Sequence, residues 1–116
     1  MNGEYRNPSL QISQVRNISF LSGELNEENA AEVDEAFRNL SVASHDATVL
    51  DMSALYITDG VGVTTMINAI RHLLERTNKV IIIAAPQMLA HNLYRVGMLA
   101  DSRIELVDMR EEEPYG

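Results

Sequence analysis

The sequence predicts an α/β fold with a mixed β-sheet of four to five strands packed with α-helices, in the order β-β-α-β-α-β-α-β. Short runs that alternate apolar and polar residues, or are apolar throughout, are typical of strands. Along the chain these runs alternate with segments whose apolar residues recur at helical spacing. No repeat, low-complexity stretch or linker divides the chain. We therefore expect one domain over residues 1–116, with a core at about 9–107 and an acidic tail at 108–116.

The opening strands are expected to pair as an antiparallel hairpin. Residues 10–12 and 18–20 alternate apolar and polar side chains, and Arg16 and Asn17 between them indicate a turn. Because the later strands alternate with helices, they are expected to be parallel and joined by helical crossovers. Together these pairings predict a mixed sheet.

A first helix is predicted over residues 27–40. Asn26 is a favourable N-cap residue, and Glu27 and Glu28 place negative charge at the positive end of the helix dipole. One apolar stripe runs along this segment, formed by Ala30, Val33, Phe37 and Leu40. The acidic side chains of the segment are expected to form a solvated surface.

Residues 48–52 predict the next strand, and a turn at 60–62 leads into a second helix that begins near residue 62. The apolar stripe of this helix comprises Val63, Met66, Ile67, Ile70 and Leu74. Residues 80–84 form an unbroken, mostly β-branched run. Such a run is typical of an interior strand covered on both faces.

A third helix is predicted to begin near residue 87. Pro86 suits its first turn, and Gly97 suits the position just past its end, where a left-handed backbone is favoured. Its buried face is expected to comprise Leu89, Leu93 and Val96. Ile104 and Leu106 alternate with charged neighbours and indicate an edge strand.

The composition narrows the possible partners. The chain has 17 acidic and 9 basic residues, a net charge of −8 and a single Lys, so direct nucleic-acid binding is not expected. No apolar run approaches the roughly 20 residues needed to cross a bilayer, and the first residues lack the features of a secretory signal. We therefore expect a cytoplasmic protein without direct membrane insertion.

Residue types that carry catalytic or metal chemistry are scarce. The chain has no cysteine, which excludes disulfides and thiolate zinc sites. His45, His72 and His91 form no metal-binding motif, and no Gly-x-Ser-x-Gly motif is present. The sequence therefore predicts no metal, no cofactor and no enzymatic activity.

Three stretches together resemble the STAS family, the sulfate transporter and anti-sigma factor antagonist domains. Residues 20–26 (FLSGELN) are similar to the family's strand that ends in Gly-Glu-Leu-Asp. Residues 50–53 (LDMS) resemble its Leu-Asp-Leu-Ser strand and are followed at the right interval by 59–63 (DGVGV). Residues 93–99 (LYRVGML) resemble its Leu-x-x-x-Gly-Leu helix ending. The order and spacing of these pieces make the resemblance fairly specific, and it implies a STAS-like mixed sheet.

The resemblance implies a regulatory protein of the anti-sigma factor antagonist type, acting by partner switching. Its implied partner is an anti-sigma factor or a related histidine-kinase-like ATPase domain, with a serine phosphatase and a second copy of the chain as further candidates. The alternative is a ligand-responsive or transporter-associated STAS module, for example in a lipid or anion transport complex.

In antagonists of this family the loop before the second helix reads Asp-Ser-Ser-Gly, and the first Ser is phosphorylated by the partner kinase. Without a gap, these positions fall on residues 59–62, so the acceptor is replaced by Gly60. A one-residue deletion would instead place Thr58 and Asp59 at the serines and would bury polar residues on the second helix. Burying unpaired polar groups costs about 1–3 kcal/mol each, so we prefer the register without a gap.

The resemblance implies a binding surface made of the loop of Thr58, Asp59, Gly60, Val61 and Gly62 together with the exposed face of the second helix. Thr58 and Thr64 are the nearest hydroxyls and thus alternative phosphoacceptors. Asp59 is expected to be the N-cap of the second helix or to bind a partner's backbone or Arg, and capping is favoured. The two glycines would allow a positive φ and a close backbone approach.

Overall fold

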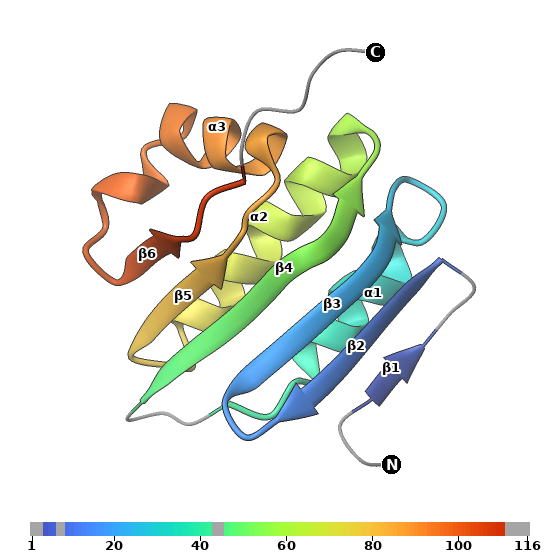
Figure 1. The fold of residues 1–116 in the computed structure, drawn as a ribbon, viewed down its shortest axis with the longest axis horizontal. Helices are drawn as coiled ribbons and strands as arrows, with labels where there is room; N and C mark the ends of the chain where they lie inside the picture. Colours follow the sequence, from blue (N-terminus) through green and yellow to red (C-terminus); the bar gives the residue numbers. More distant parts are fainter. Residues whose placement is uncertain (1–3, 7–8, 43–45, 111–116) are drawn as a thin grey trace.

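The structure, a computed structural model, describes residues 4–6, 9–42 and 46–110. Its strands form one six-stranded sheet in which each strand lies beside its neighbours in the sequence (Figure 1). Along the chain the elements are β1 (Glu4–Arg6), β2 (Leu10–Val15), β3 (Ile18–Leu25), α1 (Ala30–Arg38), β4 (Ala47–Ile57), α2 (Gly60–Leu74), β5 (Lys79–Ile83), α3 (Gln87–Arg95), the 3-10 helix η1 (Met98–Ala100) and β6 (Ile104–Val107).

The predicted α/β class is confirmed, and the predicted element order holds from β2 to β6. Strand β1 pairs antiparallel with β2, and β2 pairs antiparallel with β3 through the predicted turn at Arg16 and Asn17, whereas the later pairs are parallel. The structure adds the strand β1 at one edge, so the sheet has six strands instead of four to five. A strand of three residues is too short to show an alternating pattern, which is why the sequence does not indicate it.

In the described part of the chain, helices cover one face of the sheet and leave the other open. The strands from β3 to β6 are added in one direction, so right-handed crossovers place α1, α2 and α3 on the same side, and in Figure 1 the strands lie in front of α1 and α2. The predicted interior position of β5, between β4 and β6, is confirmed. Its Val80 and Ile82 are buried, but Ile81 and Ile83 are only half-buried. The expectation that both faces of this strand are covered is therefore wrong.

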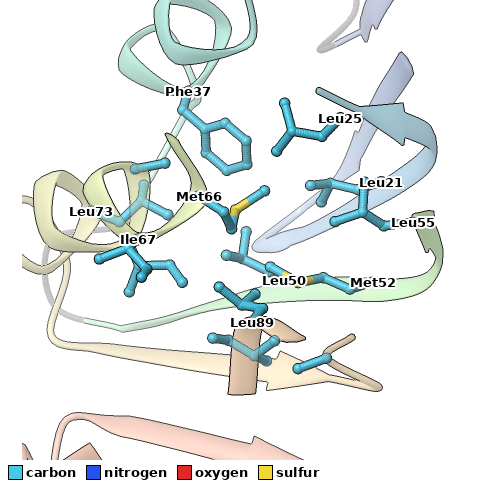
Figure 2. Close-up of a cluster of buried hydrophobic side chains, with 14 of the residues drawn as sticks. Leu21, Leu25, Phe37, Leu50, Met52, Leu55, Met66, Ile67, Leu73 and Leu89 are labelled. Atoms are coloured by element: carbon cyan, nitrogen blue, oxygen red, sulfur yellow. The ribbon is translucent and has the colours of Figure 1, made fainter. Parts of the chain in front are cut away.

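The hydrophobic core fills the space between the helices and the inner face of the sheet. Figure 2 shows Phe37 of α1 and Met66 of α2 packed with strand residues such as Leu50. Leu89 of α3 reaches the same cluster. Each helix therefore contributes its apolar stripe to one continuous core.

Helix α1 begins at Ala30, three residues after the predicted start, so Asn26 is not its N-cap. Instead, Asn26 Oδ1 accepts a hydrogen bond from the Glu28 amide (2.9 Å), and Asn29 Oδ1 accepts one from the Asn26 amide (2.9 Å). The Asn29 side chain also donates to the carbonyl of Glu24 at 2.8 Å. These bonds hold the segment in a turn and delay the helix, although the predicted apolar stripe is buried.

Helix α3 begins close to its predicted start, with Pro86 as the residue before its first turn. Leu89 and Leu93 are buried as predicted, but Val96 is 49% exposed, so its assignment to the buried face is wrong. The helix ends before Val96, and the chain turns away at Gly97, whose φ of 81° confirms its predicted left-handed conformation.

The chain still packs on the sheet beyond the predicted core limit at 107. Arg110 donates hydrogen bonds to the carbonyl oxygens of Ala84 (2.8 Å), Leu55 (2.6 Å) and Met52. Its guanidinium lies 5.5 Å from the centre of the Tyr56 ring. Two of these carbonyls belong to the part of β4 that extends past the end of β5. The chain up to Arg110 is thus not a solvated tail, and the acidic residues after it lie outside the described ones.

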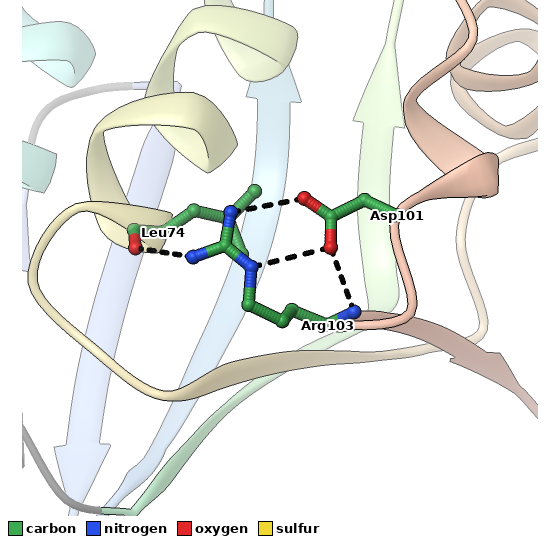
Figure 3. A network of polar contacts seen from close by, with 3 residues as sticks. All are labelled: Leu74, Asp101 and Arg103. Atoms are coloured by element: carbon green, nitrogen blue, oxygen red, sulfur yellow. Dashed lines mark hydrogen bonds and ion pairs between the residues drawn. The ribbon is translucent and has the colours of Figure 1, made fainter.

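The end of α2 is fixed to the segment before β6. Figure 3 shows Arg103 donating to the carbonyl of Leu74 at 3.1 Å and to the two carboxylate oxygens of Asp101 at 3.2 and 2.9 Å. The hydrogen bond from the Arg103 side chain lowers the pKa of Asp101, and the same contact raises the pKa of Arg103. These contacts connect α2 to the sheet at the end opposite to its N-terminus.

Candidate functional site at the start of helix α2

The residues of the predicted loop lie together where β4 leads into α2. Thr58 follows the last residue of β4, and its amide donates to the carbonyl of Leu25 at the end of β3 (3.1 Å). Thr58, Gly60 and Val61 are exposed, Val61 at 43%, whereas Gly62 is buried. A partner can therefore reach most of this loop, but not Gly62.

Asp59 caps α2 and also holds the neighbouring turn. Its Oδ1 accepts a hydrogen bond from the Gly62 amide at 2.8 Å, and its Oδ2 accepts one from the Glu27 amide at 2.9 Å. The bond from Gly62, and then the bond from Glu27, lower the pKa of Asp59. The predicted capping role is confirmed. Both carboxylate oxygens are already engaged within the chain, which disfavours direct binding of a partner by Asp59.

The two glycines of the loop have different roles. Both lie in the first turn of α2 and neither has a positive φ, so that part of the expectation is wrong. A Cβ on Gly62 would lie 2.7 Å from the Leu25 carbonyl oxygen and 2.9 Å from the Ile57 Cγ2, so the close approach expected of a glycine is found here. A Cβ on Gly60 would meet no atom within 4 Å. A serine at position 60 would therefore fit without strain.

The buried face of α2 supports the alignment without a gap. The four apolar positions that this register requires are buried: Val63, Met66, Ile67 and Ile70. The gapped register would bury instead four residues that are exposed or half-buried: Val61, Thr64, Thr65 and Asn68. The burial of α2 therefore favours the register in which Gly60 stands at the position that the resemblance assigns to the acceptor serine.

The two hydroxyls considered as alternative phosphoacceptors are both accessible. Thr58 is exposed between β4 and α2. Thr64 is exposed on α2. The helix begins at Gly60, two residues earlier than the sequence indicates, so Thr64 lies one turn after its first residue. Thr58 is the first residue of the loop and Thr64 follows the loop on α2, so a phosphate on either would add negative charge at the loop or next to it.

A groove of about 410 Å³ lies beside the loop, between α2 and α3. Residues that line it include Gly60, Thr64, Ile67, Arg71, Met88 and Val96. Sequence reasoning missed the α3 side of this groove, because the pairing of two helix faces depends on how the helices sit on the sheet. The one available signal was an apolar residue, Val96, placed directly before the glycine that ends the helix.

The described residues contain no cluster of three His, Asp or Glu side chains that could hold a metal ion. His72 lines a second groove, of about 310 Å³ between α1 and α2, beside Asp34 and Arg38, which form an ion pair at 3.2 Å. His91 is exposed on α3, and His45 lies outside the part of the chain that the structure describes. Within that part, no helix is long and apolar enough to cross a membrane.

The sequence model of the STAS domain matches residues 8–110. This match covers nearly the whole chain, so the protein belongs to the STAS domain family. The assignment confirms the resemblance carried by the three motifs and agrees with the mixed sheet and its element order. No curated protein matches the chain.

Proposed function

We propose that this STAS domain is an anti-sigma factor antagonist-like regulator that acts in the cytoplasm by partner switching. It binds an anti-sigma factor or a related histidine-kinase-like ATPase domain and has no catalytic activity of its own. Its contact surface is the exposed part of the loop, residues 58–61, with the adjoining face of α2. A serine phosphatase would belong to the same pathway only if a hydroxyl of this surface is phosphorylated.

One observation carries the proposal: the loop is presented to solvent in a fixed conformation. Asp59 joins the first turn of α2 to the turn before α1 through two backbone hydrogen bonds. Gly62 seats α2 directly against the Leu25 carbonyl. A loop fixed in this way loses little conformational entropy on binding, which favours recognition by a partner. Its exposed Val61 supplies an apolar contact at the centre.

The test is an isothermal titration calorimetry experiment. The purified chain is titrated against each anti-sigma factor and each histidine-kinase-like ATPase domain encoded in the same genome. We expect one of them to bind, and Val61→Glu to weaken binding at least about tenfold. Val15→Glu is the matched control, because Val15 is also an exposed valine but lies at the opposite end of the sheet. Binding by none of these domains would contradict the proposal.

The alternative function is a module of a transport complex. In this ligand-responsive or transporter-associated module, the partner would be a transporter subunit. Neighbouring genes discriminate between the two functions: a kinase and a sigma factor favour the first, and transporter subunits favour the second. Copurification of the chain with a transporter ATPase, and not with an anti-sigma factor, would establish the alternative.

A further inference from the structure

The groove between α2 and α3 has apolar walls that are open to solvent. Met88 of α3 and Val96, the residue directly after α3, are 48% and 49% exposed, and both line the groove. They lie eight residues apart, which corresponds to about 12 Å along a helix. On α2, Ile67 forms part of the floor and is largely buried. The groove therefore offers apolar contacts over about two helical turns.

The charged side chain that lines the groove is basic, whereas the chain as a whole is acidic. The chain has a net charge of −8, yet neither α2 nor α3 contains an Asp or Glu. These helices carry four basic side chains instead: Arg71, His72, His91 and Arg95. Arg71 lines the groove itself and is exposed. At the Gly60 end the Asp59 carboxylate already compensates the positive end of the helix dipole, so Arg71 is the source of positive charge in the groove.

The acidic residues gather elsewhere on the helical side of the molecule. Five of them lie in α1 and the turn before it: Glu27, Glu28, Glu32, Asp34 and Glu35. The groove beside α1 is polar, and its Asp34 is already paired with Arg38. Apolar walls and a basic side chain thus coincide only in the α2–α3 groove, among the two grooves described.

We propose that the α2–α3 groove binds one amphipathic helix of a partner protein, with apolar residues against Met88, Ile67 and Val96 and an Asp or Glu opposite Arg71. A helix laid between two helices fills an elongated groove of this kind with anchors at helical spacing. An Asp or Glu is expected on the partner helix because Arg71 is the only charged side chain among the described residues that line the groove. The inference rests on the proposed function, because Gly60 belongs both to the loop and to the groove.

A panel of designed helical peptides of about 16 residues, some 24 Å long, provides the probe. Each carries Leu at i, i+4 and i+7 and Glu beside this stripe, and a second panel replaces every Glu by Lys. Binding to the whole chain is measured by fluorescence anisotropy and located by amide chemical shifts. We expect an acidic peptide to bind at least about tenfold more tightly than its basic counterpart and to shift amides of α2 and α3.

Charge reversal makes the test specific. Arg71→Glu should weaken binding of the acidic peptide at least about tenfold and strengthen binding of the basic peptide. Arg95→Glu changes the net charge by the same amount on the exposed surface of α3, and at physiological salt it should alter either affinity less than about threefold, because screening weakens distant charges. Met88→Glu should abolish acidic-peptide binding, and its far-ultraviolet spectrum should match that of the wild type.

Three results would overturn the inference: no peptide of the acidic panel binds, the basic panel binds better, or the shifts map to the open face of the sheet. The protein partner separates this failure from failure of the proposed function. If Val61→Glu weakens binding of the ATPase domain but Arg71→Glu and Met88→Glu do not, the groove is not the helix site and the proposed function stands. If the acidic peptide binds with the expected charge preference but no ATPase domain does, the proposed function fails and the groove assignment stands.

Discussion

The Asp59 carboxylate accepts a hydrogen bond from the backbone amide of Glu27, 32 residues earlier in the chain, at 2.9 Å. The other carboxylate oxygen caps α2. One side chain thus fixes the turn before α1 and the first turn of α2 relative to each other. It follows that the conformation of the proposed binding loop depends on the charge of Asp59.

Asp59 should make the stability of the protein depend on acid pH. Its pKa is lowered in the folded state, so its contribution is present above the unfolded pKa of about 3.9 and is lost as the pH falls through the folded value. Asp59→Asn should lower the melting temperature at neutral pH, and the difference from the wild type should shrink below pH of about 4. Melting followed by circular dichroism across this range checks the prediction; a difference that is constant with pH would contradict it.

Alanine substitution should separate the two glycines of the loop. Gly62→Ala should lower the free energy of unfolding by about 1–3 kcal/mol, because its Cβ would overlap the Leu25 carbonyl oxygen. Gly60→Ala should raise it by up to about 1 kcal/mol, since the site is open and Ala favours the helix. Urea unfolding of both variants provides the measurement. Equal destabilisation by the two substitutions would show that the loop is packed differently.

Phosphorylation should not switch the wild-type protein at position 60, because Gly60 has no hydroxyl. Gly60→Ser should fold normally and become a substrate of the cognate kinase, given the open space around the site. Incubation with kinase and ATP, followed by mass spectrometry, maps the product. Stoichiometric phosphate on Thr58 or Thr64 of the wild type, with loss of partner binding, would show instead that the acceptor has moved.

Ser19 is a buried residue whose hydroxyl has no hydrogen-bond partner, the only such side chain in the described part of the protein. Ser19→Ala should therefore raise the free energy of unfolding by about 1 kcal/mol. Thr48→Val is the matched control, because the buried Thr48 hydroxyl donates to Thr77 Oγ1 at 3.0 Å. The Thr48→Val substitution should lower the free energy of unfolding by about 1 kcal/mol. Destabilisation by Ser19→Ala in urea unfolding would mean that its hydroxyl has a partner in solution.

Removal of the Arg110 side chain should destabilise the edge of the sheet where β4 extends past β5. Arg110→Ala leaves the carbonyls of Met52, Leu55 and Ala84 without this donor and should cost about 2 kcal/mol. Arg95→Ala, which removes an exposed arginine from α3, should change stability by less than about 0.5 kcal/mol. Hydrogen exchange should also increase for the amides of β4 near Leu55. If both variants are equally stable, the Arg110 contacts do not form in solution.

Features encoded over a few neighbouring residues could be predicted from the sequence. The buried stripe of α2, the cap at Asp59 and the left-handed Gly97 each follow from local spacing or from the preference of one residue for one backbone conformation. The family motifs also lie within short segments, and their order was sufficient to indicate the STAS family. The start of α1 could not be predicted, since the Asn26 and Asn29 side chains accept hydrogen bonds from the amides of Glu28 and Asn26 and hold this segment in a turn.

The sequence by itself determined the α/β class and the element order, because periodicity and spacing carry these directly. The family resemblance, in the register without a gap, implies that Gly60 replaces the acceptor serine. Only the tertiary structure decided which glycine is sterically required, since the atom that excludes a Cβ at Gly62 belongs to Leu25 on another strand. It also decided that Val96 opens into a groove and that Arg110 belongs to the fold. These properties depend on atoms that are distant in the chain, and only the packing of helices on one face of the sheet brings them together.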